Sequence, residues 1–181
     1  MGQVASTQMN SAIIKAAGKL LLIFTLITWA TSICFAGECQ VSRVIDGDTI
    51  EVKRGSVRLT VRLVGIDAPE TSKKKHEPGE PFSQQSTKHL AKLALNRSVD
   101  VKSYGADRYG RVLGEVFADG NNVNLEMVKA GLAEVYRGTP AQGQDLGQYW
   151  KAEEEARKAG KGIWSQANYM SPREWRKTHQ N

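Results

Sequence analysis

Two carboxylates, Asp67 and Glu70, flank Pro69 directly after an apolar, strand-like run that ends at Gly65-Ile66. Pro69 fixes its own φ and biases Ala68 toward an extended conformation, so this loop is stiff. Stiffness suits a plain structural turn, in which either acid caps a backbone group, and it equally suits a preorganised site. In the second interpretation Asp67 and the main-chain carbonyl of Ala68 bind a cation, while Glu70 lies nearby and orients or deprotonates water.

A third carboxylate, Asp48, lies in the segment IDGDT (45–49), whose plain interpretation is a turn that leads into a strand. Asp48 shares parity with Ile50 and Val52, so an unbroken strand would direct its side chain toward the apolar face. A lone carboxylate is costly to bury unless a cation or hydrogen-bond donors compensate it. A hard ion such as Ca²⁺ or Mg²⁺ is one such compensation. If closure of a barrel brings the strand ends together, Asp48 and Asp67 could share one cation.

Two arginines extend this set of residues. Arg62 lies on the strand face opposite an apolar stripe, and its plain interpretation is a solvated strand residue. Arg111 closes the segment DRYGR (107–111), where a surface ion pair with Asp107 would contribute only ~0–1 kcal/mol. Arginine also presents a planar fork that matches phosphate, and two forks opposite a metal would stabilise charge on a pentacoordinate phosphorus. The acids and arginines together are the inventory of a phosphodiesterase.

Other polar residues fit catalysis less well. His76, His89 and His179 are scattered and show no metal-ligand spacing, and the chain has neither a G-x-S-x-G motif nor a phosphate-cradling glycine loop. The lysines at 73–75 lie in a polar loop and are interpreted as a solvated loop tip. Their second interpretation is a patch that steers a nucleic-acid backbone toward the site.

The elements that must position these residues begin with a strand-like pattern over 41–64. Apolar residues alternate at 49–52 and 58–64, on either side of a predicted hairpin turn at 53–56. Two further strands are predicted at 98–104 and 112–118, the latter ending at the turn Asp119-Gly120-Asn121.

Three helices are predicted between and after these strands. The first starts near Pro81, with an inner stripe of Phe82, Ser86, Leu90 and Leu93. A short second helix begins at Asn124, with Leu125, Val128 and Leu132 directed inward. A longer third helix covers 144–159, with Leu146, Tyr149 and Trp150 at helical spacing. Gly160 and Gly162 end this third helix. Three strands, a helix, two strands and two helices predict an α+β, mainly β fold built on a small closed barrel, for which the OB-fold is the natural candidate.

The first 36 residues are interpreted as a signal peptide. Lys15 and Lys19 precede an uncharged apolar run of 17 residues, Leu20–Ala36, which ends at a small residue and predicts cleavage after Ala36. The alternative is a retained membrane anchor, although the run is shorter than the ~20 residues that span a bilayer comfortably. The predicted domain then covers 37–165, and a polar tail at 166–181 is expected to fray, with Trp164 and Trp175 as candidate anchors.

Composition bounds what the remaining 145 residues can be. They hold 23 Lys and Arg against 19 Asp and Glu, a net charge of +4 that fits a polyanionic partner without requiring one. Only Cys39 remains after the predicted cut, so the domain has no internal disulfide and must be stabilised by a packed core.

The ordered set of motifs resembles one known family. IDGDT, RLVGIDAPET and DRYGR are followed by an ADG turn, a V-N helix start, a GLA helix end and a late GIW, as in the staphylococcal nuclease (thermonuclease) family. The resemblance runs in the same order from about Val41 to Ser165. It implies a five-stranded OB-fold barrel with three helices.

The resemblance also implies an activity and the residues that perform it. The chain would be an exported endonuclease that uses Ca²⁺ to hydrolyse phosphodiester bonds of DNA and RNA, single-stranded or duplex, and leaves 3′-phosphate and 5′-hydroxyl ends. Metal ligands would be Asp48, Asp67 and the Ala68 carbonyl, at a position where the family's prototype has Thr. Glu70 would act as general base, and Arg62 and Arg111 would bind phosphate.

Substrate contacts are the part of the family pattern that this chain matches least. Tyr109 in DRYG matches the family, whereas GLAEVYRG (131–138) offers only Tyr136 of the prototype's nucleotide-stacking pair. The alternative function is a noncatalytic OB module that binds nucleic acid or protein, and a further one is a membrane-anchored protein with a vestigial site. No stable protein partner is implied, a monomer is expected, and membrane contact is expected only if the N-terminal segment is retained.

Overall fold

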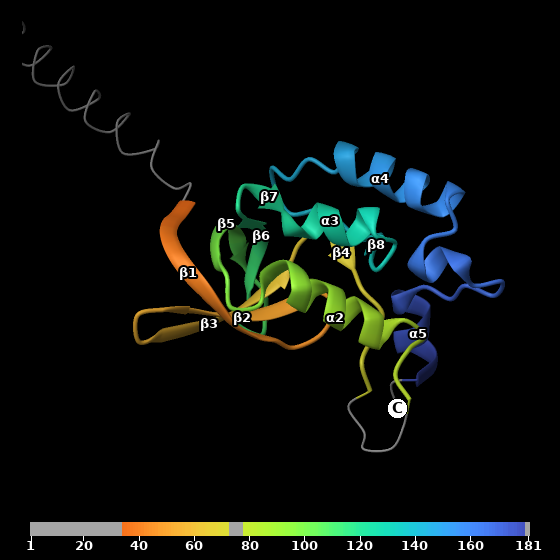
Figure 1. Cartoon of the computed structure of the whole chain (residues 1–181), viewed down its shortest axis with the longest axis horizontal. Coiled ribbons are helices and arrows are strands. Elements are labelled where there is room, and N and C mark those ends of the chain that lie inside the picture. Colours follow the sequence, from red (N-terminus) through yellow and green to blue (C-terminus); the bar gives the residue numbers. More distant parts are fainter. Residues whose placement is uncertain (1–33, 73–77, 180–181) are drawn as a thin grey trace, which may run out of the picture. The chain divides into compact units, whose positions relative to one another are not determined.

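Five strands close into a barrel in the computed structural model, which describes residues 34–72 and 78–179 (Figure 1). The strands are β1 Cys34–Val44, β2 Thr49–Arg54, β3 Val57–Leu63, β5 Ser98–Ala106 and β6 Val112–Ala118, with the short β7 Asn121–Asn122 extending the sheet. The order is β3-β2-β1-β5-β6, and a parallel pairing of β3 with β6 closes the barrel. The predicted α+β, mainly β class and the five-stranded OB-type barrel are confirmed.

The strands form where the sequence alternates. Ile50 and Val52 on β2, and Val61 and Leu63 on β3, are fully buried inside the barrel, as their parity predicts. Gly55, with φ near +60°, makes the tight turn between β2 and β3, a conformation that glycine adopts without steric cost. Cys39 on β1 is a free thiol buried in the same core.

Helices and short strands cover the barrel. They are β4 Ile66–Asp67, α2 Ser83–Ala94, α3 Val123–Lys129, β8 Glu134–Val135, α4 Gly147–Lys158, the 3-10 helix η1 Gly162–Ser165 and α5 Pro172–His179. α3 lies between the barrel and α4, and β4 pairs with β8 outside the main sheet (Figure 1). The described residues therefore hold four α-helices, one more than predicted.

Two details of the predicted helices differ in the structure. The short helix α3 begins at Val123, one residue before the predicted start, and Asn122 caps it, since its side chain accepts a hydrogen bond from the Leu125 N–H. Trp150 is 44% exposed and lies beneath the Arg137 guanidinium, 4.7 Å from its ring centroid. The inward face of α4 follows the spacing of Tyr149, Ala152 and Ala156, and the neighbouring position 150 is turned about 100° away from Tyr149.

The C-terminal stretch does not fray as expected, because it forms α5. The sequence Ser171-Pro172-Arg173-Glu174 makes a capping box: the Glu174 N–H donates to Ser171 Oγ at 3.2 Å, and the Ser171 N–H donates to Glu174 Oε2 at 3.0 Å. Pro172 occupies the first helical position, which suits its fixed φ. The division into 37–165 and 166–181 stays a prediction.

Several sequence predictions fall on residues that the structure does not describe. The signal peptide lies almost wholly before Cys34, and Lys73–75 and His76 lie in the undescribed segment 73–77. β1 begins at Cys34, so its first three residues belong to the predicted leader, and cleavage after Ala36 stays a prediction. Within 34–72 and 78–179, no helix has the length and apolar character needed to cross a membrane.

Asn124 ties the first turn of α3 to the barrel. Its buried side chain donates from Nδ2 to the carbonyls of Val64 (2.9 Å) and Gly114 (3.1 Å), and its Oδ1 accepts from the Val116 N–H at 3.0 Å. One amide therefore satisfies main-chain groups on β6 and on the chain that leaves β3, the two strands that close the barrel.

Replacing Asn124 should destabilise the fold sharply. In Asn124→Ala the buried groups lose their partners, so we expect the free energy of unfolding to fall by about 3 kcal/mol in urea titrations. The exposed Asn121, which bonds only weakly to the Asp119 carbonyl at 3.3 Å, is the control, and Asn121→Ala should change stability by less than about 0.5 kcal/mol. Equal effects of the two substitutions would contradict the role given to Asn124.

Candidate active site

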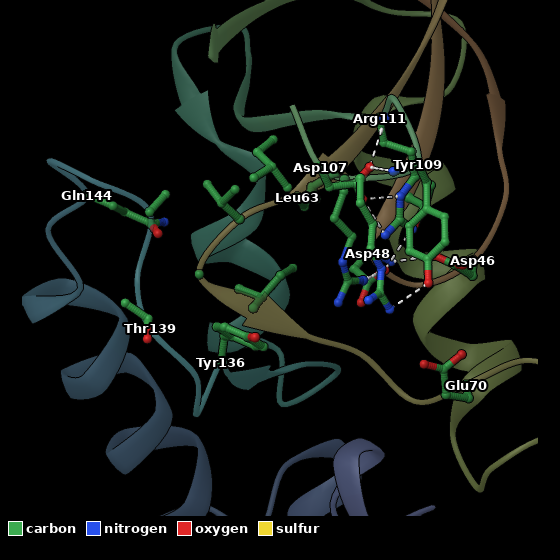
Figure 2. Close-up of a pocket in the computed structure, with 18 of the residues that line it drawn as sticks. Asp46, Asp48, Leu63, Glu70, Asp107, Tyr109, Arg111, Tyr136, Thr139 and Gln144 are labelled. Carbon is green, nitrogen blue, oxygen red and sulfur yellow. Dashed lines mark hydrogen bonds and ion pairs between the residues drawn. The ribbon is translucent and has the colours of Figure 1, made fainter. Parts of the chain in front are cut away.

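A cleft of about 800 Å³ opens where β2 begins and β3 ends (Figure 2). Asp48, Arg62, Glu70, Tyr109 and Arg111 all line it, although they come from segments far apart in the chain. The structure thus brings most of the predicted site residues to one hollow. Asp67 and Ala68 lie beside it, buried behind the lining residues.

Asp48 is buried at the entrance to β2, with 4% of its surface exposed, as its strand parity predicts. Its Oδ2 accepts a hydrogen bond from the Ala68 N–H at 3.0 Å, and its Oδ1 accepts one from the Thr49 hydroxyl at 3.1 Å. Oδ1 also forms an ion pair with Nη1 of Arg62. A buried carboxylate needs such partners, and here the loop after β3 and the strand β3 itself supply them.

Asp67 lies on β4, opposite Glu134 of β8, and is only 2% exposed. Its Oδ1 accepts from Nη2 of Arg62 at 3.1 Å, while Asp48 contacts Nη1 of the same guanidinium. The two acids therefore share one cationic partner, which in this structure is the side chain of Arg62. The metal ion that the two acids are expected to share stays a prediction.

The parallel pairing of β3 with β6 brings the two predicted phosphate-binding arginines close together. Val61 pairs with Val112, so Arg62 on β3 and Arg111, which immediately precedes β6, lie at the same end of the barrel. Arg111 forms the ion pair with Asp107 that its plain interpretation predicts, through Nε at 2.8 Å and Nη2 at 2.7 Å. This pair uses part of a guanidinium that has five N–H donors, and the side chain still lines the cleft.

Two tyrosines mark the walls of the cleft. Tyr109 is 68% exposed, and the guanidinium groups of Arg108 and Arg111 lie 4.8 and 5.6 Å from its ring centroid. Tyr136 follows β8, and its N–H donates to the Gly65 carbonyl at 2.9 Å. Figure 2 shows Tyr136 and Thr139 on the side of the cleft away from Tyr109.

Glu70 is held in place through its main chain by Glu80, a residue that the sequence analysis missed. The Glu70 N–H donates to Glu80 Oε2, and the Glu80 N–H donates to the Glu70 carbonyl, both at 2.9 Å. Burial, opposed by the bond from Glu70 and reinforced by the charges of Glu70 and Asp67, raises the pKa of Glu80 to about 7. Its position in a polar loop carries no signal that distinguishes it from a solvated acid.

Arg176, on α5, is the second residue that the sequence analysis missed. Its Nη1 donates to Asp67 Oδ1 at 3.0 Å and to Glu70 Oε1 at 2.7 Å, and its Nη2 donates to Asp67 Oδ2 at 2.6 Å. These contacts raise the pKa of Arg176 further, so the group is a permanent cation. The capping box at Ser171 could have predicted the helix, but not which of its cations reaches the site.

The donor set fits a hard metal ion with few protein ligands. The residues that the structure describes include no group of three or more His, Cys, Asp or Glu side chains placed to hold a metal. Asp48 and Asp67 do direct one carboxylate oxygen each toward the same cationic group, and main-chain and carboxylate oxygens are the donors that Ca²⁺ prefers. The assignment of Asp48, Asp67 and the Ala68 carbonyl as ligands stays a prediction. Among the histidines, His89 is half-buried on α2 and His179 stacks on Trp175 with ring centroids 3.7 Å apart.

Comparisons with known proteins agree with this geometry. The family model described as "Staphylococcal nuclease homologue" matches residues 60–166. A protein of Shigella flexneri named micrococcal nuclease is 35% identical over 94% of this chain and 95% of its own length. Proteins named uncharacterized endonuclease in Haemophilus influenzae and Escherichia coli are 37% and 39% identical, over 88% and 86% of this chain and 83% and 94% of their own lengths.

These matches extend over most of the chain and include the strands and loops that form the cleft. The family is one of metal-dependent nucleases, which accords with acids and arginines gathered at one end of the barrel. The chain therefore belongs to the staphylococcal nuclease homologue family and is a nuclease.

Proposed function

We propose that this nuclease is an exported, calcium-dependent endonuclease that hydrolyses phosphodiester bonds of DNA and RNA and leaves 3′-phosphate and 5′-hydroxyl ends. The observation that carries the proposal is the pair of buried acids, Asp48 and Asp67, which share one cationic partner at the edge of the cleft. Glu70, Arg62 and Arg111 line the same cleft.

Asp48, Asp67 and the Ala68 carbonyl would hold the metal. Bound there, Ca²⁺ would supply Lewis-acid stabilisation of a phosphoryl oxygen and orient the substrate. Both carboxylates are now paired with Arg62. A metal held by these carboxylates would replace Arg62 as their partner, and the Arg62 fork would then be available to a phosphate group.

Glu70 is suited to be the general base. Its carboxylate reaches the cleft, while its main chain is fixed on both sides by hydrogen bonds to Glu80. A base must lie within hydrogen-bond reach of the water it deprotonates, and a fixed main chain limits the positions its carboxylate can take. In the proposed step, Glu70 takes a proton from water as the water oxygen bonds to phosphorus.

The two arginines would bind the phosphate as charge develops. Their forks match phosphate oxygens, and fixed donors stabilise a transition state without reorganising. The bond from phosphorus to the 5′ oxygen breaks, and the departing oxygen takes a proton from solvent water and becomes a 5′-hydroxyl. The 3′ side keeps the phosphate, which is the outcome that the resemblance implies.

The exposed tyrosines support a substrate with unstacked bases. Aromatic rings beside a cationic groove bind single-stranded nucleic acid with little sequence preference, because every base has a π face. Tyr109 lies against two guanidinium groups and Tyr136 lies on the other wall. We therefore propose that single-stranded DNA and RNA are cut more readily than duplex.

Calcium dependence and the product ends can be measured together. We expect the purified protein to cleave single-stranded DNA with Ca²⁺ and to lose activity in a chelator, because two acids and one carbonyl cannot stabilise the phosphoryl charge by themselves. Products should accept a 5′ label from a kinase without prior phosphatase treatment. Binding of DNA without cleavage under any divalent ion would favour a noncatalytic module, and 5′-phosphate products would exclude the proposed bond cleavage.

Substitutions of the proposed base and of one phosphate-binding arginine, compared with a control outside the cleft, should distinguish a loss of catalysis from a loss of protein stability. Glu70→Gln should lower kcat by about 10²–10⁴-fold through loss of proton abstraction, and Arg111→Ala by about 100-fold or more through loss of a charged donor. Arg97 is the control, since it forms a comparable ion pair with Asp119 at 2.8 Å and does not line the cleft. Arg97→Ala should retain full activity, and an equal loss in all three variants would argue against the assigned roles.

Export rests on the uncharged run Leu20–Ala36 after Lys15 and Lys19. We expect mass spectrometry of the protein recovered from outside the cytoplasm to show an N-terminus at Gly37. A protein that keeps its first residues and sediments with membranes would instead be anchored. A full-length protein found only in the cytoplasm would contradict export.

A further inference from the structure

One guanidinium, that of Arg176, joins the proposed metal ligand Asp67 to the proposed general base Glu70. Its Nη1 lies 3.0 Å from Asp67 Oδ1 and 2.7 Å from Glu70 Oε1, so a single nitrogen bridges the two acids. Its Nη2 adds a bond of 2.6 Å to Asp67 Oδ2, which makes the contact with Asp67 bidentate. We propose that Arg176 is a positioning residue of this nuclease site, which fixes Asp67 and Glu70 relative to each other.

The acids need such a residue because they repel one another. Asp67, Glu70 and Glu80 bring carboxylates close together, and Asp67 and Glu80 are buried. Charge-assisted, bidentate bonds are among the strongest hydrogen bonds in proteins and set orientation as well as charge. Without Arg176, the main chain of Glu70 would keep its hydrogen bonds to Glu80. The Glu70 carboxylate, however, would have no charged partner on α5 to fix its orientation.

Helix α5 is itself held in place, so the Arg176 side chain extends from a main chain whose position is fixed. The capping box between Ser171 and Glu174 sets the start of the helix. The Tyr169 hydroxyl donates to Glu134 Oε2 at 2.8 Å, and Glu134 is the residue that pairs with Asp67 across β4 and β8. Trp164 packs on Tyr169 with ring centroids 4.6 Å apart. The segment before α5 is thus tied to β8, the strand that pairs with β4, where Asp67 lies.

The geometry favours positioning over direct binding of substrate. Arg176 lines the cleft, as Arg111 does, but its three hydrogen bonds from Nη1 and Nη2 are directed at the two acids. Arg111 instead makes its ion pair with Asp107, which is neither a proposed metal ligand nor the proposed base. α5 also lies beyond residues 60–166, the part of the chain that the family model matches. The inference rests on the proposed roles of Asp67 as ligand and Glu70 as base.

The test compares Arg176→Gln with Arg173→Gln, which removes the same charge from an exposed position on the same helix. In Arg176→Gln we expect kcat to fall by about 10- to 100-fold with KM changed less than about twofold, as for residues that orient metal ligands. Calorimetric titration of Ca²⁺ into the metal-free protein should show affinity lower by about tenfold. Arg173→Gln should match the wild type in both measurements.

Arg176→Lys keeps the charge but cannot form the bidentate fork, so its Ca²⁺ affinity should lie between those of the wild type and Arg176→Gln. This variant also serves if Arg176→Gln does not fold, which circular dichroism of each variant would reveal. A lysine variant that equals the wild type in Ca²⁺ affinity and kcat would overturn the requirement for a fork and with it the proposed geometry.

Three further outcomes would overturn the proposal. If Arg176→Gln had the same kcat and Ca²⁺ affinity as Arg173→Gln, the contacts of Arg176 with Asp67 and Glu70 would have no role in positioning. Tighter Ca²⁺ binding in Arg176→Gln would mean that Arg176 competes with the metal, and a rise in KM alone would mean that it binds substrate. Wild-type protein that shows no Ca²⁺-dependent cleavage would instead refute the proposed function, and the Ca²⁺ titration would still test Arg176.

Discussion

The arrangement of the rest of the site depends on how the charges of two neighbouring buried carboxylates are compensated. Asp48 and Asp67 are 4% and 2% exposed, and isolated charges so far from water are destabilising unless cations and donors compensate them. The chain supplies Arg62 from the neighbouring strand, the Ala68 N–H from the adjoining loop and Arg176 from the last helix. The β2–β3 hairpin makes the first of these contacts possible, because its Thr49–Arg62 pairing places Arg62 beside Asp48. The β3–β6 pairing that closes the barrel then brings Arg111 to the same end.

The features that could be predicted from the sequence are those with a local period. Alternation along 49–52 and 58–64 defines the barrel strands, and the parity of Asp48 with Ile50 predicts its burial correctly. The stiff loop around Pro69 and the turn before Arg111 also belong to short segments with recognisable chemistry. The ordered motifs then indicated the family, which the comparisons confirmed.

What escaped prediction depends on contacts between distant segments. Arg176 meets Asp67 across 109 residues, and no periodicity distinguishes it from Arg173 or Lys177 on the same short helix. Glu80 is an acid in a polar loop until the chain folds it against the main chain of Glu70. Trp150 shows the opposite error, since a large aromatic residue in a helical pattern lies outside, where Arg137 covers its ring.

The position of α5 in the chain has a consequence for proteolysis. The barrel strands, the helices α2, α3 and α4 and the proposed catalytic acids all lie before residue 166, whereas Arg176 follows ten residues later. A protease that cuts just before α5 would therefore remove Arg176 and leave every proposed metal ligand and the proposed base in the chain. In that product Asp67 and Glu70 would lack their common partner.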